Sequence, residues 1–159
     1  MADQVFNIAK GRIVELYNRV ESNDPTNSAF IVVLLKASEA DATLIDYDDL
    51  GTLLAVAGNT EADFTNYARK VVTDSELAAL PSPDDTNNVY DVDLPDQTWT
   101  SAGGASNNTL TKLLICYDSD TTGGTDSNII PLAHFDFTPT TAGGNLTAQI
   151  NTAGFFRGS

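Results

Sequence analysis

The sequence predicts a mainly β protein: an antiparallel β-sandwich or small barrel with one short helix and an N-terminal arm. Three observations carry this prediction. From Tyr67 onward, apolar residues recur mostly at every second position, the period of a strand with one buried face. Turn-forming Gly, Asp, Asn and Thr residues interrupt that pattern about every 8–12 residues. Before Tyr67, one apolar run of strand length and one short helical stripe stand out.

The length and composition indicate one folded domain. The chain has 159 residues, of which 42% are hydrophobic and 19% are charged. These proportions are ordinary for a globular protein and exclude wholesale disorder. No internal repeat divides the sequence. We therefore expect an N-terminal arm over residues 1–22, followed by a single β-rich domain over residues 23–159.

The N-terminal segment, residues 5–20, fits two alternatives. Four of its apolar residues lie at helical spacing: Ile13, Leu16, Tyr17 and Val20. Phe6 and Ile8 instead alternate, as they would in an extended arm or a strand. Gly11 weakens a long helix by about 1 kcal/mol relative to alanine. A polar loop that contains Pro25 separates this segment from the rest of the chain.

The next two elements have simple patterns. Residues 29–36 form a continuous, β-branched apolar run, which predicts a strand buried on both faces. Residues 49–57 predict a short helix, because Asp46 or Asp48 can cap its beginning and Gly58 can end it. The apolar face of this helix comprises Leu50, Leu53, Leu54 and Ala57.

The remainder of the chain predicts a series of short strands. They cover residues 67–73, 89–94, 97–100, 110–117, 129–137, 146–150 and 154–157. The last two should form a hairpin-like pair. Pro131 predicts an edge position or a bulge, because proline has no N–H to donate to a neighbouring strand. Residues 74–80 fit a single helical turn.

The charge balance is strongly acidic. Eight Lys and Arg residues stand against 22 Asp and Glu residues, which gives a net charge of −14. Beyond Lys70 the only basic residues are Lys112 and Arg157. Binding to nucleic acid or to an anionic membrane needs clustered basic side chains, so we expect neither partner. No apolar stretch reaches the roughly 18–20 residues that span a bilayer, and the sequence begins without a signal-peptide pattern, so we expect synthesis in the cytoplasm.

The residues that could carry chemistry are few and separated. Cys116 is the only cysteine and lies in an apolar run, which indicates a buried side chain rather than a nucleophile. The acidic loop 118–126 has part of a calcium-loop spacing, but Ile129 stands where the closing carboxylate is required. His134, the only histidine, is expected on a sheet surface. We therefore expect no catalytic residues, no cofactor and no metal site.

Several short motifs give the sequence a resemblance to a known group. In order they are YARK (67–70), DDTNN (84–88), DQTW (96–99), KLLICYD (112–118), IIPL (129–132), HFDF (134–137) and AGFFR (153–157). This ordered set resembles small virion structural proteins of tailed bacteriophages, and it extends over about two-thirds of the chain. Among the roles in that group, the capsid decoration (cement) type fits a small, acidic, β-rich protein best.

The resemblance implies a location and a set of partners. It implies a place on the outer surface of the capsid, where the protein would bind the major capsid protein and stabilise contacts between its subunits. It also implies a homo-oligomer, for which a trimer is one arrangement. A head–tail connector or a tail structural protein is the first alternative. A β-sandwich carbohydrate-binding module is the second, although Trp99 is the only tryptophan available for sugar stacking.

The two ends of the chain supply candidate contact residues. Apolar and basic side chains gather near both ends, whereas most other elements end in polar turns. The candidates are Phe6, Ile8, Arg12, Ile13, Phe155, Phe156 and Arg157. Buried aromatic and arginine anchors carry much of the energy of protein association, so these residues would contact capsid or sister subunits. Alternatively, Phe155 and Phe156 complete the core of the domain itself.

Overall fold

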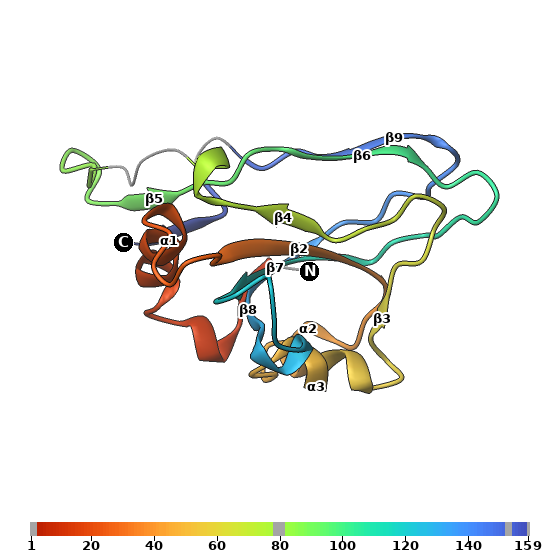
Figure 1. Ribbon diagram of the computed structural model, residues 1–159, viewed down its shortest axis with the longest axis horizontal. Coiled ribbons are helices and arrows are strands. Elements are labelled where there is room, and N and C mark those ends of the chain that lie inside the picture. The colour runs from red at the N-terminus through yellow and green to blue at the C-terminus, as the bar shows by residue number, and fades with distance from the viewer. Residues whose placement is uncertain (1–2, 78–81, 152–153, 159) are drawn as a thin grey trace.

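The centre of the molecule is a six-stranded antiparallel sheet, seen in the computed structural model, which describes residues 3–77, 82–151 and 154–158 (Figure 1). Five strands follow the order β1–β8–β7–β2–β3, and β4 pairs with the same strand as β3, namely β2. Their bounds are β1 Gln4–Val5, β2 Ala29–Ala37, β3 Thr60–Glu61, β4 Lys70–Val72, β7 Lys112–Asp118 and β8 Ile130–Asp136.

The two central strands are β2 and β7, as their sequences predict. Their register runs from Ala29 opposite Asp118 to Leu35 opposite Lys112. All seven residues of β7 and the first seven of β2 are buried. The prediction of a strand buried on both faces over residues 29–36 is confirmed. Burial on both faces requires a covering layer on each side of the sheet.

One covering layer consists of two strand ribbons. In the first, β5 (Tyr90–Val92) pairs with β10 (Phe156–Gly158), and in the second, β6 (Gln97–Ala102) pairs with β9 (Gly144–Ala148). Figure 1 shows the second ribbon, β6 and β9, above the main sheet. The arrangement confirms a mainly β, sandwich-like fold. The hairpin expected between the last two strands is wrong, since β9 and β10 each pair with an earlier strand.

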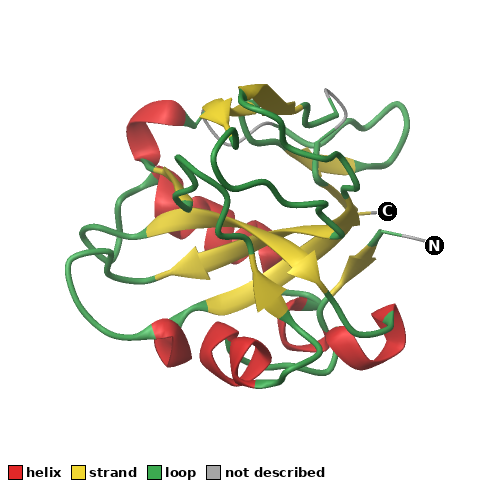
Figure 2. Cartoon of the chain, turned by 90° about the vertical axis from the view of Figure 1, so that its right-hand side faces the viewer, coloured by secondary structure: helices red, strands yellow, loops and turns green. Residues whose placement is uncertain are grey.

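The opposite layer is helical. Helices α2 (Asp41–Leu44) and α3 (Leu50–Ala55) lie beneath the main sheet, as Figures 1 and 2 show. The leucine stripe of the predicted helix is confirmed, because Leu50 and Leu53 are buried in α3. Asp49 caps this helix by accepting a 2.7 Å bond from the Thr52 N–H. The cap is one residue after Asp48 and three after Asp46, the two candidates in the sequence, and α2 is an addition to the single helix expected.

The N-terminal segment is folded into the domain and does not project as an arm. It contains a 3-10 turn, η1 (Asn7–Ala9), and a helix, α1 (Ile13–Glu21). Its helical stripe is buried: Ile13, Leu16, Tyr17 and Val20. Residues 1–22, expected as a separate arm, therefore contribute to the same hydrophobic core as residues 23–159.

Two further short 3-10 turns punctuate the strands. They are η2 (Asp74–Glu76) and η3 (Asp126–Asn128). The first corresponds to the helical turn expected over residues 74–80, of which residues 78–80 lie outside the part of the chain described. Pro131 stands at a register shift between β7 and β8, so the expected bulge is confirmed. Proline occupies this position without loss because a bulge leaves one backbone group unpaired.

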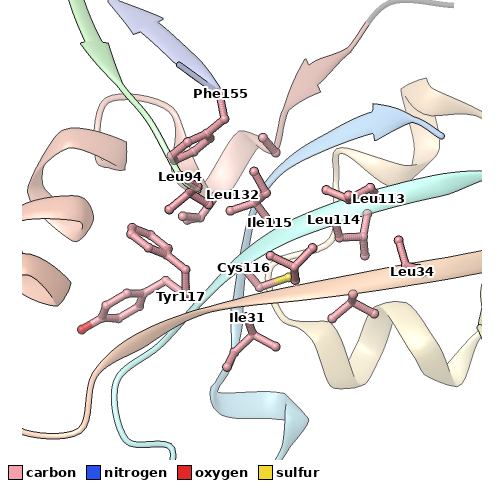
Figure 3. Close-up of a cluster of buried hydrophobic side chains, with 14 of the residues drawn as sticks. Ile31, Leu34, Leu94, Leu113, Leu114, Ile115, Cys116, Tyr117, Leu132 and Phe155 are labelled. Carbon is pink, nitrogen blue, oxygen red and sulfur yellow. The ribbon is translucent and has the colours of Figure 1, made fainter. Parts of the chain in front are cut away.

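Strand register divides the main sheet into two faces, since residues opposite each other in an antiparallel pair point to the same side. We call the side that carries Leu114 and His134 the helix face, because Lys112 on the same side contacts Asp41 of α2. We call the side that carries Phe30 the ribbon face, because Phe30 packs against Phe155 beside β10. Figure 3 shows Phe155 and Leu94 pointing at the main sheet from the ribbon layer.

Candidate functional site

The seven candidate contact residues differ widely in exposure. Phe6, Ile13 and Phe155 are 0%, 1% and 7% exposed and belong to the core of this chain. Three others are partly exposed: Ile8, Arg12 and Phe156. Arg157 alone is exposed. Fully buried side chains offer no surface to a partner, so any contact through this set depends on Ile8, Arg12, Phe156 and Arg157.

Phe6 anchors the N-terminal segment on the helix face. Its ring meets the ring of His134 edge to face, with centroids 5.7 Å apart. Its backbone N–H donates to the Leu132 carbonyl at 3.0 Å. Removal of residues 1–12 would take both Phe6 and the buried Ala9 out of the core. We therefore expect this truncation to destabilise the domain, contrary to the expectation of a separate arm over residues 1–22.

The C-terminal strand is attached through a close approach at Gly154. This residue has φ +87°, and a Cβ there would lie 2.3 Å from the carbonyl oxygen of Val92. Only glycine fits such a conformation and such a contact without strain. The next N–H, that of Phe155, donates to the same carbonyl at 2.9 Å. Gly154 of the AGFFR motif thus allows the C-terminal segment to lie close to β5, with which β10 pairs.

An aromatic row connects the C-terminal strand with α1. The Phe155 and Phe30 rings are 6.0 Å apart, and the Tyr17 and Phe30 rings are 5.8 Å apart. These contacts complete the core on the ribbon face. Phe6 lies on the opposite face, so the structure does not bring the seven candidates into one patch.

Arg157 is engaged within the chain. Its guanidinium donates two bonds to the Asp91 carboxylate, at 2.6 and 2.7 Å. These bonds hold the pKa of Asp91 below its ordinary value. The Arg157 side chain is 52% exposed, and solvent screening leaves an exposed pair of this kind little effect on stability. The pair fixes β10 on β5 more by geometry than by energy.

A second ion cluster surrounds Arg69. This arginine donates to Asp126 in η3 and to Glu61 in β3, with bonds of 2.6–2.8 Å. Its hydrogen bonds lower the pKa of Asp126. The hydroxyl of Tyr67 also donates to Glu61. The YARK motif therefore fastens β3, β4 and η3 to one another.

The contacts of Arg69 also involve the calcium-like loop 118–126. Its last carboxylate, Asp126, is bound to Arg69, and Asp118 and Asp120 accept hydrogen bonds from the N–H groups of Asp120 and Thr122 within the loop. Among the residues that the structure describes, no three His, Cys, Asp or Glu side chains are placed to hold a metal ion. The loop is a turn closed by its own side chains.

A third ion cluster is buried on the helix face. Lys112, 2% exposed, contacts Asp41 of α2 and Asp136 of β8. Burial alone would lower the pKa of Lys112, but the bonds to Asp136 and Asp41 raise it overall. Lys112 is the first residue of β7, a strand whose residues are all buried. The cluster joins the helical layer to the main sheet.

His134 is buried, contrary to the expected place on a sheet surface. It is 0% exposed, and neither ring nitrogen has a hydrogen-bond partner within the described part of the chain. Burial lowers the pKa of His134, and the nearby Lys112 cation lowers it further. The expectation was wrong because the N-terminal segment covers this face of the sheet with Phe6. The alternating pattern of the strand alone gave no sign of that covering segment. Cys116 is buried as predicted, and burial raises the pKa of its thiol.

Two long segments of the chain carry no charged side chain. Residues 97–111 and 137–156 contain no Asp, Glu, Lys, Arg or His. The structure brings them together: β6 pairs with β9, and Thr109 forms a bridge with Thr140. We call residues 97–111 and 137–151 the charge-free end. Its surface is made of exposed threonine, serine, asparagine and glycine residues, and Figure 1 places its two strands in the outermost layer.

The charge-free end contrasts with the rest of the chain, which holds every one of the 22 carboxylates. The sequence analysis did not identify this end as a candidate surface. The two long segments without charged residues are visible in the sequence. What the sequence could not supply was that these segments, about 40 positions apart, form one ribbon.

Trp99 fixes the charge-free end to the main sheet. It is 1% exposed, its indole N–H donates to the Ala68 carbonyl at 2.8 Å, and Lys70 lies 5.5 Å from its ring centroid. The tryptophan is therefore part of the packing between β6 and the main sheet. It offers no open ring for a sugar to stack upon.

Comparison of the chain with protein-family models, with curated proteins and with solved structures gives no match. In the portion of the chain described, none of the helices has the length and apolar character needed to cross a membrane.

Proposed function

We propose that this chain is a structural protein of a tailed-phage virion, and that it decorates the outside of the head by bridging copies of the major capsid protein. The ordered motifs from YARK to AGFFR support this proposal. In the structure these motifs hold the domain together: Arg69 joins three elements, Trp99 holds the ribbon, and Phe155 closes the core. A rigid domain of this kind suits a protein that clamps its neighbours and carries out no chemistry.

The observation that carries the proposal is the distribution of charge. Five of the eight basic residues form ion pairs within the chain: Arg19, Lys36, Arg69, Lys112 and Arg157. All the carboxylates lie outside the charge-free end, and two of them, Asp63 and Asp96, accept hydrogen bonds from Asn108 and Ile150 at its margin. Like charges oppose close approach, and a high net charge keeps particles soluble and apart.

The contact surface we propose is the charge-free end. Many copies of a protein with a charge of −14 can crowd onto one shell only if their contacts avoid the acidic surface. Exposed hydroxyl and amide groups such as those of Thr98, Thr100 and Asn145 can form hydrogen bonds across an interface without the cost of desolvating a charge. The partly exposed Ile8, Arg12 and Phe156 remain candidates for secondary contacts with sister subunits.

The burial of Trp99 weighs against a carbohydrate-binding module, because such modules present aromatic rings to the sugar. Cys116 and His134 are both fully buried, and we propose no catalytic role toward a substrate. A head–tail connector or tail protein uses the same kind of rigid β domain. It differs in copy number, which makes it an outcome of the experiment below.

Quantitative mass spectrometry of purified particles tests the proposal. Decoration predicts hundreds of copies, in a fixed ratio to the major capsid protein, whereas a connector or tail ring predicts about six or twelve. A matching binding assay should show the purified chain sedimenting with assembled shells and not with free capsid subunits. Absence of the chain from particles would contradict a virion role. A ring-like copy number would replace decoration by the connector.

A further inference from the structure

The buried ion cluster on the helix face brings an amine and two carboxylates into contact. The Nζ atom of Lys112 lies 2.5 Å from Oδ1 of Asp41 and also contacts Oδ1 of Asp136. The side chains of Lys112, Asp41 and Asp136 are 2%, 11% and 31% exposed. Asp136 is the direct cross-strand neighbour of Lys112, so the amine is held between Asp136 of the sheet and Asp41 of α2.

We propose that Lys112 and Asp41 join in an intramolecular amide bond, with Asp136 as the proton carrier. The ion pair is the starting state. The Nζ–Cγ bond forms between Lys112 and Asp41, and one C–O bond of the Asp41 carboxylate breaks. The departing oxygen leaves as water with two of the three ammonium protons, and the third stays on the amide nitrogen. Charge and atoms balance, and no oxidant, metal or cofactor is required.

Proximity is the main reason that this condensation can proceed here. In water an ammonium and a carboxylate remain separate hydrated ions. In the structure the two groups are in contact and stripped of most of their water, and well-oriented intramolecular reactions reach effective molarities of about 10⁵–10⁸ M.

The two aspartates differ in a way that assigns their roles. Asp41 is the more buried, so its carboxyl group is the one held against the amine and away from solvent. Asp136 reaches solvent and touches the same amine, so it can take the first proton and pass it on as general base and then general acid. The next pair on this face, Leu114 and His134, is fully buried and closes the floor of the cluster.

The product water has an exit. A hollow of about 360 Å³ adjoins the cluster and is lined by Lys112, Asp41 and Asp136 together with Glu39, Thr111 and Thr138. The new bond would close the chain between α2 and β7, a span that contains β3 to β6. A covalent closure of a loop of this length restricts the unfolded chain, as a disulfide does. This inference does not rest on the proposed function.

Mass spectrometry of the denatured, purified wild-type chain tests the proposal without any variant. The expected mass is lower than the sequence mass by one water, about 18 Da, once the N-terminal residue has been established by peptide mapping. Proteolysis should yield one branched peptide that joins the segments around Asp41 and Lys112. A wild-type mass equal to that of the sequence overturns the proposal, as does a loss of water mapped to any other pair.

Two variants assign the roles. Lys112→Arg keeps the cation but cannot form this bond, so its mass should equal that of its sequence. Asp136→Asn keeps the shape of the side chain and removes the proton carrier, so freshly made protein should contain a larger unreacted fraction than the wild type. Complete reaction in Asp136→Asn would overturn the role given to Asp136, while the branched wild-type peptide would still decide the bond itself.

Discussion

On the helix face of the main sheet, charged side chains lie inside the structure, whereas the charge-free end over the ribbon face has none. Lys112 with its two aspartates and Arg69 with Glu61 and Asp126 connect α2, η3 and β3 to the sheet. The charge-free end is held instead by strand pairing and by Trp99. The two regions therefore differ in role. Buried ion pairs connect the elements of the domain, and the surface without charged side chains is available for contact with another protein.

The inward ions stabilise the fold in a particular sense. The attraction within a buried ion pair is largely offset by the free energy needed to remove both charges from water. The loss of one partner leaves the other charge buried and unpaired, which is strongly destabilising. An exposed ion pair returns little, and its loss costs little. The comparison therefore predicts a steep gradient of mutational effects across the molecule.

The largest effect should follow the removal of the buried cation. Lys112→Met preserves the length of the side chain and removes both the cation that pairs with Asp41 and Asp136 and the amine that would join Asp41, so we expect a loss of about 3–5 kcal/mol in the free energy of unfolding. Lys36→Met is the matched control, because Lys36 pairs with the exposed Asp63 and should lose about 0–1 kcal/mol. Urea denaturation measures both. Equal losses would contradict the contrast between inward and outward ions.

The next effect distinguishes two adjacent aromatic residues. Phe155→Ala removes a ring buried against Phe30, so we expect a loss of about 3 kcal/mol in unfolding free energy. Phe156 is partly exposed on the other side of the strand, and its replacement by alanine should cost about 1 kcal/mol. The reverse order in thermal or urea unfolding would show that Phe156 and not Phe155 completes the core.

A smaller effect concerns pH and His134. Its folded-state pKa is lowered, so the unfolded chain binds the proton first and stability falls as pH drops below about 6.5. Between pH 7 and 5.5 we expect a loss of about 1 kcal/mol. The carboxylates with lowered pKa, such as Asp126, lose their contribution only below about pH 4. His134→Leu should remove most of the change in this interval, and an unchanged slope in that variant would assign it to another group.

The sequence was sufficient for the parts of the fold that local pattern determines. The apolar run of β2, the leucine stripe of α3 and the bulge at Pro131 each follow from residues close together in the chain. The path of the chain between layers was not available in this way. β9 and β10 have strand patterns, but nothing local shows that they pair with β6 and β5.

Burial at the chain ends was equally beyond local pattern. Phe6 and Phe155 look like exposed anchors because they stand near the ends, yet each fills a space made by distant strands. The same reason hid the charge-free end, whose two segments become one surface only after folding. The Lys112 cluster also needed the fold, since Asp41 and Asp136 lie far from it in the sequence.

The central claim is that the charge-free end makes the contact with the particle. Thr100→Glu adds one carboxylate to the exposed surface of this end, and Thr43→Glu adds one to the exposed surface of α2 in the opposite layer. Surface changes of this kind should shift stability by no more than about 0.5 kcal/mol, so both variants should fold. Co-sedimentation with assembled shells then measures binding alone.

We predict that Thr100→Glu weakens binding to shells about tenfold, because its carboxylate must lose water or meet a like charge at the interface. Thr43→Glu should bind as the wild type does. Wild-type binding by Thr100→Glu, or a loss confined to Thr43→Glu, would contradict the account and would move the contact surface to the helical layer.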